Sequence, residues 1–133
     1  MCCFRGRIHD RSHTRKGLLE SLDRNAPAFT LVVEHQDELT GYALGRQGSR
    51  ADHLGPWVSQ DVASARALLD EFLQRSCRDT IFVDWMTSSS FARPLLRSYG
   101  FELTRPLTRM YRGPNACPGQ TELVCAILGP EFG

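Results

Sequence analysis

The sequence predicts one α+β domain built on a mixed, largely antiparallel sheet with a parallel crossover. Near the N terminus, a short amphipathic helical segment precedes three β-rich segments separated by turn residues, which is typical of a helix followed by an antiparallel meander. A longer helical segment then leads into a buried β segment, as in a βαβ unit. The 133 residues are 41% hydrophobic and 23% charged, which is enough for one soluble domain with a single core.

The N-terminal residues divide into a linker and a helix. Residues 1–9 show no apolar period, so we expect them to be linker-like or disordered and the folded domain to span residues 10–133. Within the domain, Leu18, Leu19 and Leu22 lie on one stripe of a helix that should end before Pro27.

Three strands of a meander should follow, at about residues 28–35, 41–46 and 51–58. The third strand contains Gly55 and Pro56. Proline cannot donate to a ladder and glycine has no side chain to pack, so we expect this strand to separate from its neighbour at that point. The sequence therefore predicts splayed central strands.

The residues after the meander predict a helix that returns across the sheet. Asp61 is expected to be its N-cap, and apolar residues recur at helical spacing from Val62 to Leu73. The apolar run at residues 79–86 predicts a buried strand that pairs in parallel with the third meander strand.

The C-terminal third should contain one helix and two strands. The segment TSSSFARPLLRSYGF predicts a serine-rich helix start, with Pro94 in the first turn and a left-handed stop at Gly100. Strands are expected at about residues 102–113 and 122–129.

Composition excludes several classes of function. Sixteen Lys and Arg against fifteen Asp and Glu give a formal charge of +1, so no global field favours a nucleic acid or an anionic membrane as partner. The five cysteines form no C-x-x-C pair and leave one over from full pairing, which argues against a zinc site and a disulfide framework. No apolar run approaches the ~20 residues of a membrane span. We expect a cytoplasmic protein without a metal.

The order of elements resembles that of the GNAT-type N-acetyltransferases. The features that carry the resemblance are the meander, the bulged strand that leads into a helix, the crossover strand and the segment LLRSYGF. Four further segments resemble, more narrowly, the C-terminal domain of two-domain GNAT proteins of the YitH type: DRSHTRKGLLESLDRNAP, GYALGRQGSRADHLGPWV, RPLTRMYRGP and AILGPEFG. This resemblance spans about residues 9–133. It implies that the N-terminal GNAT domain of such proteins is missing from the chain.

The resemblance implies an acetyl-CoA site between the splayed strands. In that family the strand backbone contacts the pantetheine arm, and the next helix N terminus receives the pyrophosphate. Ser89 stands where the family has an asparagine. The residues that would contact the cofactor here are Leu54, Gly55, Pro56, Trp57, Val58 and Ser89.

Two departures from the family pattern bear on this site. The usual R/Q-x-x-G-x-G/A loop is replaced by VSQDVASARALL, in which Asp61 would bring a carboxylate to the diphosphate, so we expect the junction to cap a helix instead. Leu96 replaces the tyrosine that protonates the leaving thiolate in the family. Tyr99 could take that role only if the helix end were reshaped, and otherwise packs beside Phe101.

His53 and Asp84 are the main candidates for taking a proton from an amine acceptor. His53 lies closest to the expected slot, and histidine titrates near neutral pH; the alternative is a solvent-exposed histidine. Asp84 interrupts an apolar run, where a carboxylate needs hydrogen bonds or a cation; the alternative is a structural hydrogen bond. Further candidates are Asp52, Glu34 and His35.

Two functional hypotheses follow from the sequence. In the first, the domain is an N-acyltransferase that moves an acetyl or acyl group from acyl-CoA to the amine of a small molecule or a protein. In the second, it is a GNAT-derived domain that binds no cofactor and acts as a substrate-binding or interaction module. A homodimer, or pairing with another GNAT domain, would cover the sheet edges.

Overall fold

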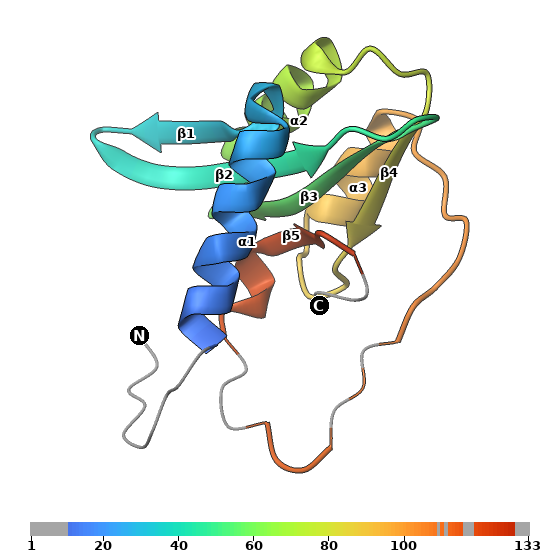
Figure 1. Cartoon of the computed structure of the whole chain (residues 1–133). Helices are drawn as coiled ribbons and strands as arrows, with labels where there is room; N and C mark the ends of the chain where they lie inside the picture. The colour runs from blue at the N-terminus through green and yellow to red at the C-terminus, as the bar shows by residue number, and fades with distance from the viewer. Residues whose placement is uncertain (1–10, 109, 111, 116–118, 130–133) are drawn as a thin grey trace.

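The computed structural model describes residues 11–108, 110, 112–115 and 119–129, so the predicted linker at residues 1–9 lies outside it. The described residues form three layers (Figure 1). A five-stranded sheet lies between helix α1 (Arg11–Asn25) on one face and helices α2 (Val62–Arg75) and α3 (Ala92–Ser98) on the other. The predicted α+β class is confirmed.

The first half of the sheet is the predicted meander. Strands β1 (Leu31–His35), β2 (Glu38–Arg46) and β3 (Asp52–Ser59) pair antiparallel in sequence order. The first strand starts later than expected, because Pro27–Phe29 forms the 3-10 turn η1 after the end of α1.

The crossover from β3 through α2 to β4 (Ile81–Trp85) is also as predicted, but the expectation that this last strand is buried is wrong, because Phe82 is 54% exposed and the other four residues are only half-buried. The side chain of Asp61 caps α2, and its Oδ1 accepts a hydrogen bond from Ser64 N at 2.8 Å. Strand β4 pairs in parallel with β3. A helix that packs on one face of the sheet therefore connects the two parallel strands, as in a βαβ unit.

The C-terminal third differs from its prediction at the start of α3. Gly100 has a φ of +84° and ends α3 in the left-handed conformation, and Pro94 lies in the first turn, both as expected. The N-cap residue, however, is Phe91, which forms no side-chain cap, so the expected serine cap is wrong. Two of the serines contact the C-terminal segment instead: Ser88 Oγ donates to Thr121 O at 2.7 Å, and Ser89 Oγ lies 4.0 Å from Cys125 Sγ.

The predicted strand at residues 102–113 is wrong. Residues 101–108 and 110 have no regular secondary structure, and Arg109 and Tyr111 lie outside the described residues. Leu103, Leu107 and Met110 are 60%, 51% and 86% exposed. They bury too little apolar surface to offset the entropy of ordering a strand, and Pro106 removes a ladder donor. The last strand is shorter than expected, because the 3-10 turn η2 (Thr121–Leu123) precedes β5 (Val124–Ile127).

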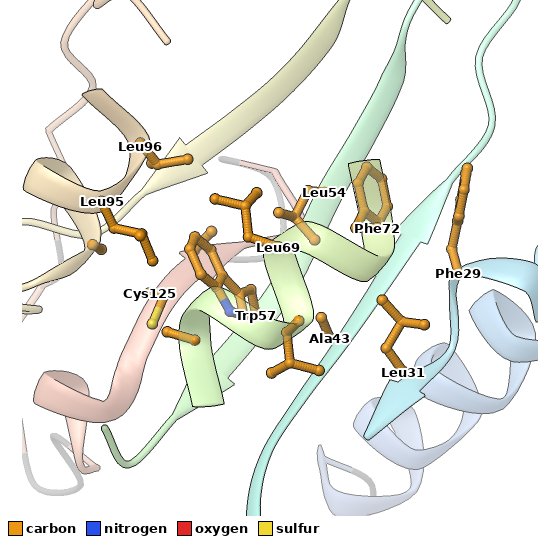
Figure 2. Packing of buried hydrophobic residues seen from close by; sticks show 14 of the residues in the cluster. Phe29, Leu31, Ala43, Leu54, Trp57, Leu69, Phe72, Leu95, Leu96 and Cys125 are labelled. Atoms are coloured by element: carbon orange, nitrogen blue, oxygen red, sulfur yellow. The ribbon is translucent and has the colours of Figure 1, made fainter. Parts of the chain in front are cut away.

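The main hydrophobic core fills the space between the sheet and helices α2 and α3. Figure 2 shows Trp57 of β3 at its centre, with Leu69 and Phe72 of α2. The rings of Phe72 and Phe29 lie 4.5 Å apart between centroids. On the opposite face, a smaller cluster of Leu22, Leu44 and Leu128 joins α1 to the sheet. Each large apolar side chain buried in this way contributes roughly 1.5–3 kcal/mol.

Adding a methyl group at Gly45 tests how closely α2 packs on β2. A Cβ there would lie 2.5 Å from Phe72 Cε2 and 2.8 Å from His53 O. We expect Gly45→Ala to lower the free energy of unfolding by about 1–3 kcal/mol, because the close contacts force the strand and helix apart. Urea denaturation followed by circular dichroism measures the change.

Gly17→Ala is the matched control for that substitution. Gly17 is exposed in α1, and no heavy atom lies within 4 Å of its added Cβ. The same chemical change should therefore raise the free energy of unfolding by about 0.5–1 kcal/mol, through helix propensity. Equal effects at both glycines would contradict the packing argument.

Candidate functional site

Strands β3 and β4 part halfway along their length. Their parallel register runs from Asp52 opposite Ile81 to Leu54 opposite Val83 and ends there, just before Gly55. The two diverging ends, residues 55–59 of β3 and 84–85 of β4, form a fork. The splayed central strands that Gly55 and Pro56 predicted are confirmed.

Strand β5 fills the fork. Ala126 is the register partner of Trp57 on one side and of Trp85 on the other, and both pairings are antiparallel. Met86 N donates a hydrogen bond to Cys125 O at 2.9 Å, which extends the contact beyond β4. The C-terminal strand of the chain therefore lies where the splayed strands would otherwise leave a slot.

The expected cofactor-contacting residues lie along one arm of the fork. Leu54 and Trp57 are fully buried, and their side chains belong to the main core. A Cβ on Gly55 would overlap the carbonyl oxygen of Ile127, and Val58 lies opposite Val124. Strand β5 thus lies where the resemblance implied a pantetheine arm, beside Leu54, Gly55, Pro56, Trp57 and Val58.

Ser89, the sixth expected cofactor contact, is buried beside β5. Its Oγ lies 4.0 Å from Cys125 Sγ, and its backbone N donates to Met86 O at 3.3 Å. Burial raises the pKa of the Cys125 thiol to about 11. This thiol is therefore protonated at neutral pH and is chemically unreactive while β5 is in the fork.

The carboxylate of Asp61 caps the N terminus of α2. Besides accepting from Ser64 N, Asp61 accepts a hydrogen bond at Oδ2 from Ser64 Oγ at 3.0 Å. The bond from the Ser64 backbone lowers the pKa of Asp61, so the cap is anionic at neutral pH. The expectation that this junction caps a helix is confirmed, and the charge of the cap opposes a phosphate group at the same place.

A cavity of about 300 Å³ lies between α2 and α3. Val62 and Arg66 line it from α2, and Phe91, Pro94 and Leu95 line it from the other side. It has a largely apolar wall with one cation, which suits a ligand with an anionic end.

Tyr99, an expected catalytic acid, lies on this same side of the sheet. Its Oη donates to Asp70 Oδ1 at 2.5 Å and accepts from Arg66 Nη1 at 3.2 Å. The ring packs against the main core, and the Arg66 guanidinium lies 5.7 Å from its centroid. These contacts tie Tyr99 to α2, and the structure does not bring it together with His53 or Asp84.

His53 and Asp84 do come together, on the face of the sheet that α1 partly covers. Leu54 and Val83 pack into the main core, so strand alternation turns His53 and Asp84 to the opposite face. His53 Nε2 lies 3.3 Å from Asp84 Oδ2, and the two side chains are 16% and 26% exposed. Because Leu54 and Val83 form the last register pair, this histidine and aspartate lie at the closed end of the fork.

Arg46 is a member of this group that the sequence reasoning missed. Its Nη2 lies 3.3 Å from His53 Nδ1. A guanidinium N–H can only donate, so this contact is a hydrogen bond when Nδ1 is unprotonated, and the ring proton of the neutral imidazole then lies on Nε2, facing Asp84. Arg46 and His53 are register partners across the β2–β3 turn, and a hairpin drawn from the sequence could have placed them opposite each other.

The other proton-transfer candidates lie elsewhere. Asp52 is buried and accepts a hydrogen bond from Ser76 Oγ at 2.7 Å, which ties the end of α2 to β3. Glu34 and His35 are exposed at the end of β1.

In the part of the chain that the structure describes, no helix has the length and hydropathy needed to cross a bilayer. Within the same residues, no group of three or more acidic, histidine or cysteine side chains is arranged to hold a metal ion.

Comparisons with known proteins identify the family. The sequence matches the family described as acetyltransferase (GNAT) domain over residues 10–126. The chain therefore belongs to the GNAT acetyltransferase family. The comparison with curated proteins found no match.

Two solved structures share the fold. They are crystal structures of TTHA1254 from Thermus thermophilus, as the wild type and as a single-substitution mutant. The TM-scores are 0.57 and 0.58 at 20% sequence identity, over 73% and 74% of this chain and 78% and 79% of that chain. A likeness at this level of identity shows the fold alone.

The pH dependence of stability tests the charged cap at Asp61. We expect Asp61→Ala to lower the free energy of unfolding by about 1 kcal/mol at pH 7, because the side-chain acceptor of the cap is lost. Because the folded-state pKa is lowered, the contribution of the carboxylate is fully present above its unfolded pKa and is lost as the pH falls through the folded value.

The difference between wild type and Asp61→Ala should accordingly shrink below about pH 4. Urea denaturation at pH 7 and at pH 3 measures it. A difference that is independent of pH would show that ionisation of Asp61 contributes nothing.

Proposed function

We propose that this GNAT domain is an N-acyltransferase that uses acyl-CoA, with acetyl-CoA as the expected donor, and acts on the amine of a small molecule or a protein. Family membership supports acetyltransferase-type chemistry. The observation that carries the proposal is the His53 and Asp84 pair at the closed end of the fork. That is the point where the two strands that frame the donor site in this family diverge.

The pair is suited to handling the proton of an amine. An amine is mostly protonated at neutral pH and must lose a proton before it can attack a thioester. His53 would take that proton, while Asp84 holds the imidazole in one orientation and stabilises the imidazolium, as the third member of a catalytic triad does. An acyl-CoA would supply the thioester, whose C–S bond breaks as the amide N–C bond forms.

Acyl-CoA does not fit the fork in the conformation described. Strand β5 pairs with both arms, and the Asp61 carboxylate lies at the helix N terminus where a diphosphate would bind. The proposed activity therefore requires β5 to leave the fork. The strand has four residues, and residues 101–108 before it have no regular secondary structure, so its withdrawal need not unfold a helix.

The same observations favour a second candidate function. If β5 stays in the fork, the domain binds no acyl-CoA and acts as a substrate-binding or interaction module. The absence of the family tyrosine at Leu96 is consistent with this alternative.

We also propose the narrower relationship to the C-terminal domain of two-domain GNAT proteins of the YitH type. The support is the four sequence segments that resemble it, in the same order. Pairing with another GNAT domain, or with a second copy of this chain, would then cover apolar side chains such as Leu103, Leu107 and Met110. The cysteine pattern is the reason to expect a cytoplasmic location.

Titration with acetyl-CoA separates the two candidate functions. If the donor replaces β5, ~1 mM acetyl-CoA should give a heat of binding in calorimetry. It should also speed the alkylation of Cys125 by iodoacetamide, because that thiol would leave the core. Peptide mass spectrometry reads the alkylation, and exposed Cys77 is the internal control. No heat and no change at Cys125 would eliminate the acyltransferase in favour of the module.

Substitution of Asp84 tests the assignment of the proton-transfer pair. Asp84→Asn keeps the shape of the side chain but removes the charge that would stabilise the imidazolium, so kcat/KM for acyl transfer should fall by roughly 10²- to 10⁴-fold. Asp79→Asn, at an exposed position just before β4, is the matched control and should leave kcat/KM unchanged. Wild-type activity in Asp84→Asn would rule out this pair as the proton-transfer group.

A further inference from the structure

A cationic groove adjoins His53 at the turn between β2 and β3. It has a volume of about 400 Å³, and Arg46, Arg50, His53 and Phe82 contribute its larger side chains. Among the described residues that line it, none is an aspartate or a glutamate. The groove therefore presents two fixed positive charges next to the proposed proton-transfer pair.

The groove has the parts needed to hold a small anion with a short carbon chain. A guanidinium binds a carboxylate or phosphate through two parallel N–H groups, and two arginines can share one anion. Phe82 projects from β4 on this face and is 54% exposed, which leaves its ring available to cover a short apolar chain. Gly48 N donates to Asp52 Oδ1 at 3.4 Å, so the turn that follows Arg46 and carries Arg50 is tied to β3.

Arg46 links the anion site to the imidazole. Arg46 Nη2 lies 3.3 Å from His53 Nδ1, and with Nδ1 unprotonated it donates to the lone pair that would accept a proton from an amine. A carboxylate or phosphate oxygen is a stronger acceptor for a guanidinium than a neutral imidazole nitrogen is. A bound anion would therefore draw Arg46 away from Nδ1 and release the lone pair.

We propose that this groove is the acceptor site and that it takes a small amine carrying a carboxylate or a phosphate. The anion binds Arg46 and Arg50, and the amine comes to His53 Nδ1. One proton then passes from the amine nitrogen to Nδ1, which gives a neutral amine and an imidazolium facing Asp84. The assignment of this ligand as an acceptor rests on the proposed function, whereas the anion site itself does not.

The ring nitrogens of His53 report on this site directly. We would titrate 15N-labelled protein with β-alanine, O-phosphoethanolamine and propylamine, each to about 10 mM, a range that covers weak binding. The His53 signals are assigned by their loss in His53→Gln. We expect β-alanine or O-phosphoethanolamine to shift the Nδ1 resonance as Arg46 leaves it, and propylamine, which has no anion, to leave it in place. The two anionic amines distinguish a carboxylate site from a phosphate site.

Three arginine variants separate the anion contact from general charge. Arg46→Gln and Arg50→Gln should each weaken the binding of the responding amine about tenfold or more, because each loses a charge-assisted hydrogen bond. Arg46→Gln alone should also change the His53 nitrogen shifts before any ligand is added. Arg78→Gln removes the same charge from an exposed residue outside the groove and should behave as wild type.

The proposal fails if neither anionic amine shifts the His53 signals, if propylamine shifts them equally, or if Arg46→Gln and Arg50→Gln bind as wild type. The titration contains no acyl-CoA, so it does not depend on the donor site. If an anionic amine shifts the His53 signals but acetyl-CoA gives no heat of binding, the proposed acyl-transfer function is wrong and the anionic-amine site stands. If the protein transfers acyl groups but neither anionic amine shifts the His53 signals, only the proposed class of acceptor is wrong.

Discussion

The pairing of the backbone around Gly55 and Pro56 determines which strands lie next to each other in this sheet. Pro56 has no N–H for a neighbouring strand, and Gly55 lets the Ile127 carbonyl approach where any side chain would collide. Strand β3 therefore pairs with β4 only as far as Leu54, and the gap beyond is wide enough for another strand. The place of β5, the burial of Ser89 and the meeting of His53 with Asp84 all depend on this divergence.

The two faces of the sheet offer different chemistry at the fork. On the face covered by α2 and α3, the anionic cap at Asp61 stands in place of the glycine loop of the family pattern. Tyr99, which would have to supply the catalytic acid there, is hydrogen-bonded to Asp70. On the other face, a histidine lies between an arginine and an aspartate beside a cationic groove. The residues of the proposed acceptor site thus lie together in this conformation, whereas strand β5 pairs with both arms of the fork where the donor is proposed to bind.

Local signals in the sequence located most of the fold. Pro27, Asp61 and Gly100 mark element ends through backbone chemistry that does not depend on distant residues, and the bulge at Gly55 and Pro56 is of the same kind. The strand expected at residues 102–113 failed because strand formation depends on burial by distant residues, which local propensity does not report. For the same reason the sequence indicated that β5 is a strand but not that it lies between β3 and β4. Arg46 was missed because its role comes from cross-strand register.

Strand β5 and the residue that follows it contribute to both hydrophobic clusters. Cys125 and Ala126 are buried in the main core, while Leu128, just beyond the strand, packs with Leu22 of α1 and Leu44. The hydrophobic clusters on the two faces of the sheet therefore share one short segment of the chain. Removing this segment from the sheet would loosen the packing of α1 and expose Trp57 at the same time. The mobility of α1 is therefore coupled to the position of β5. Partial opening is for this reason less favourable than an all-or-none transition.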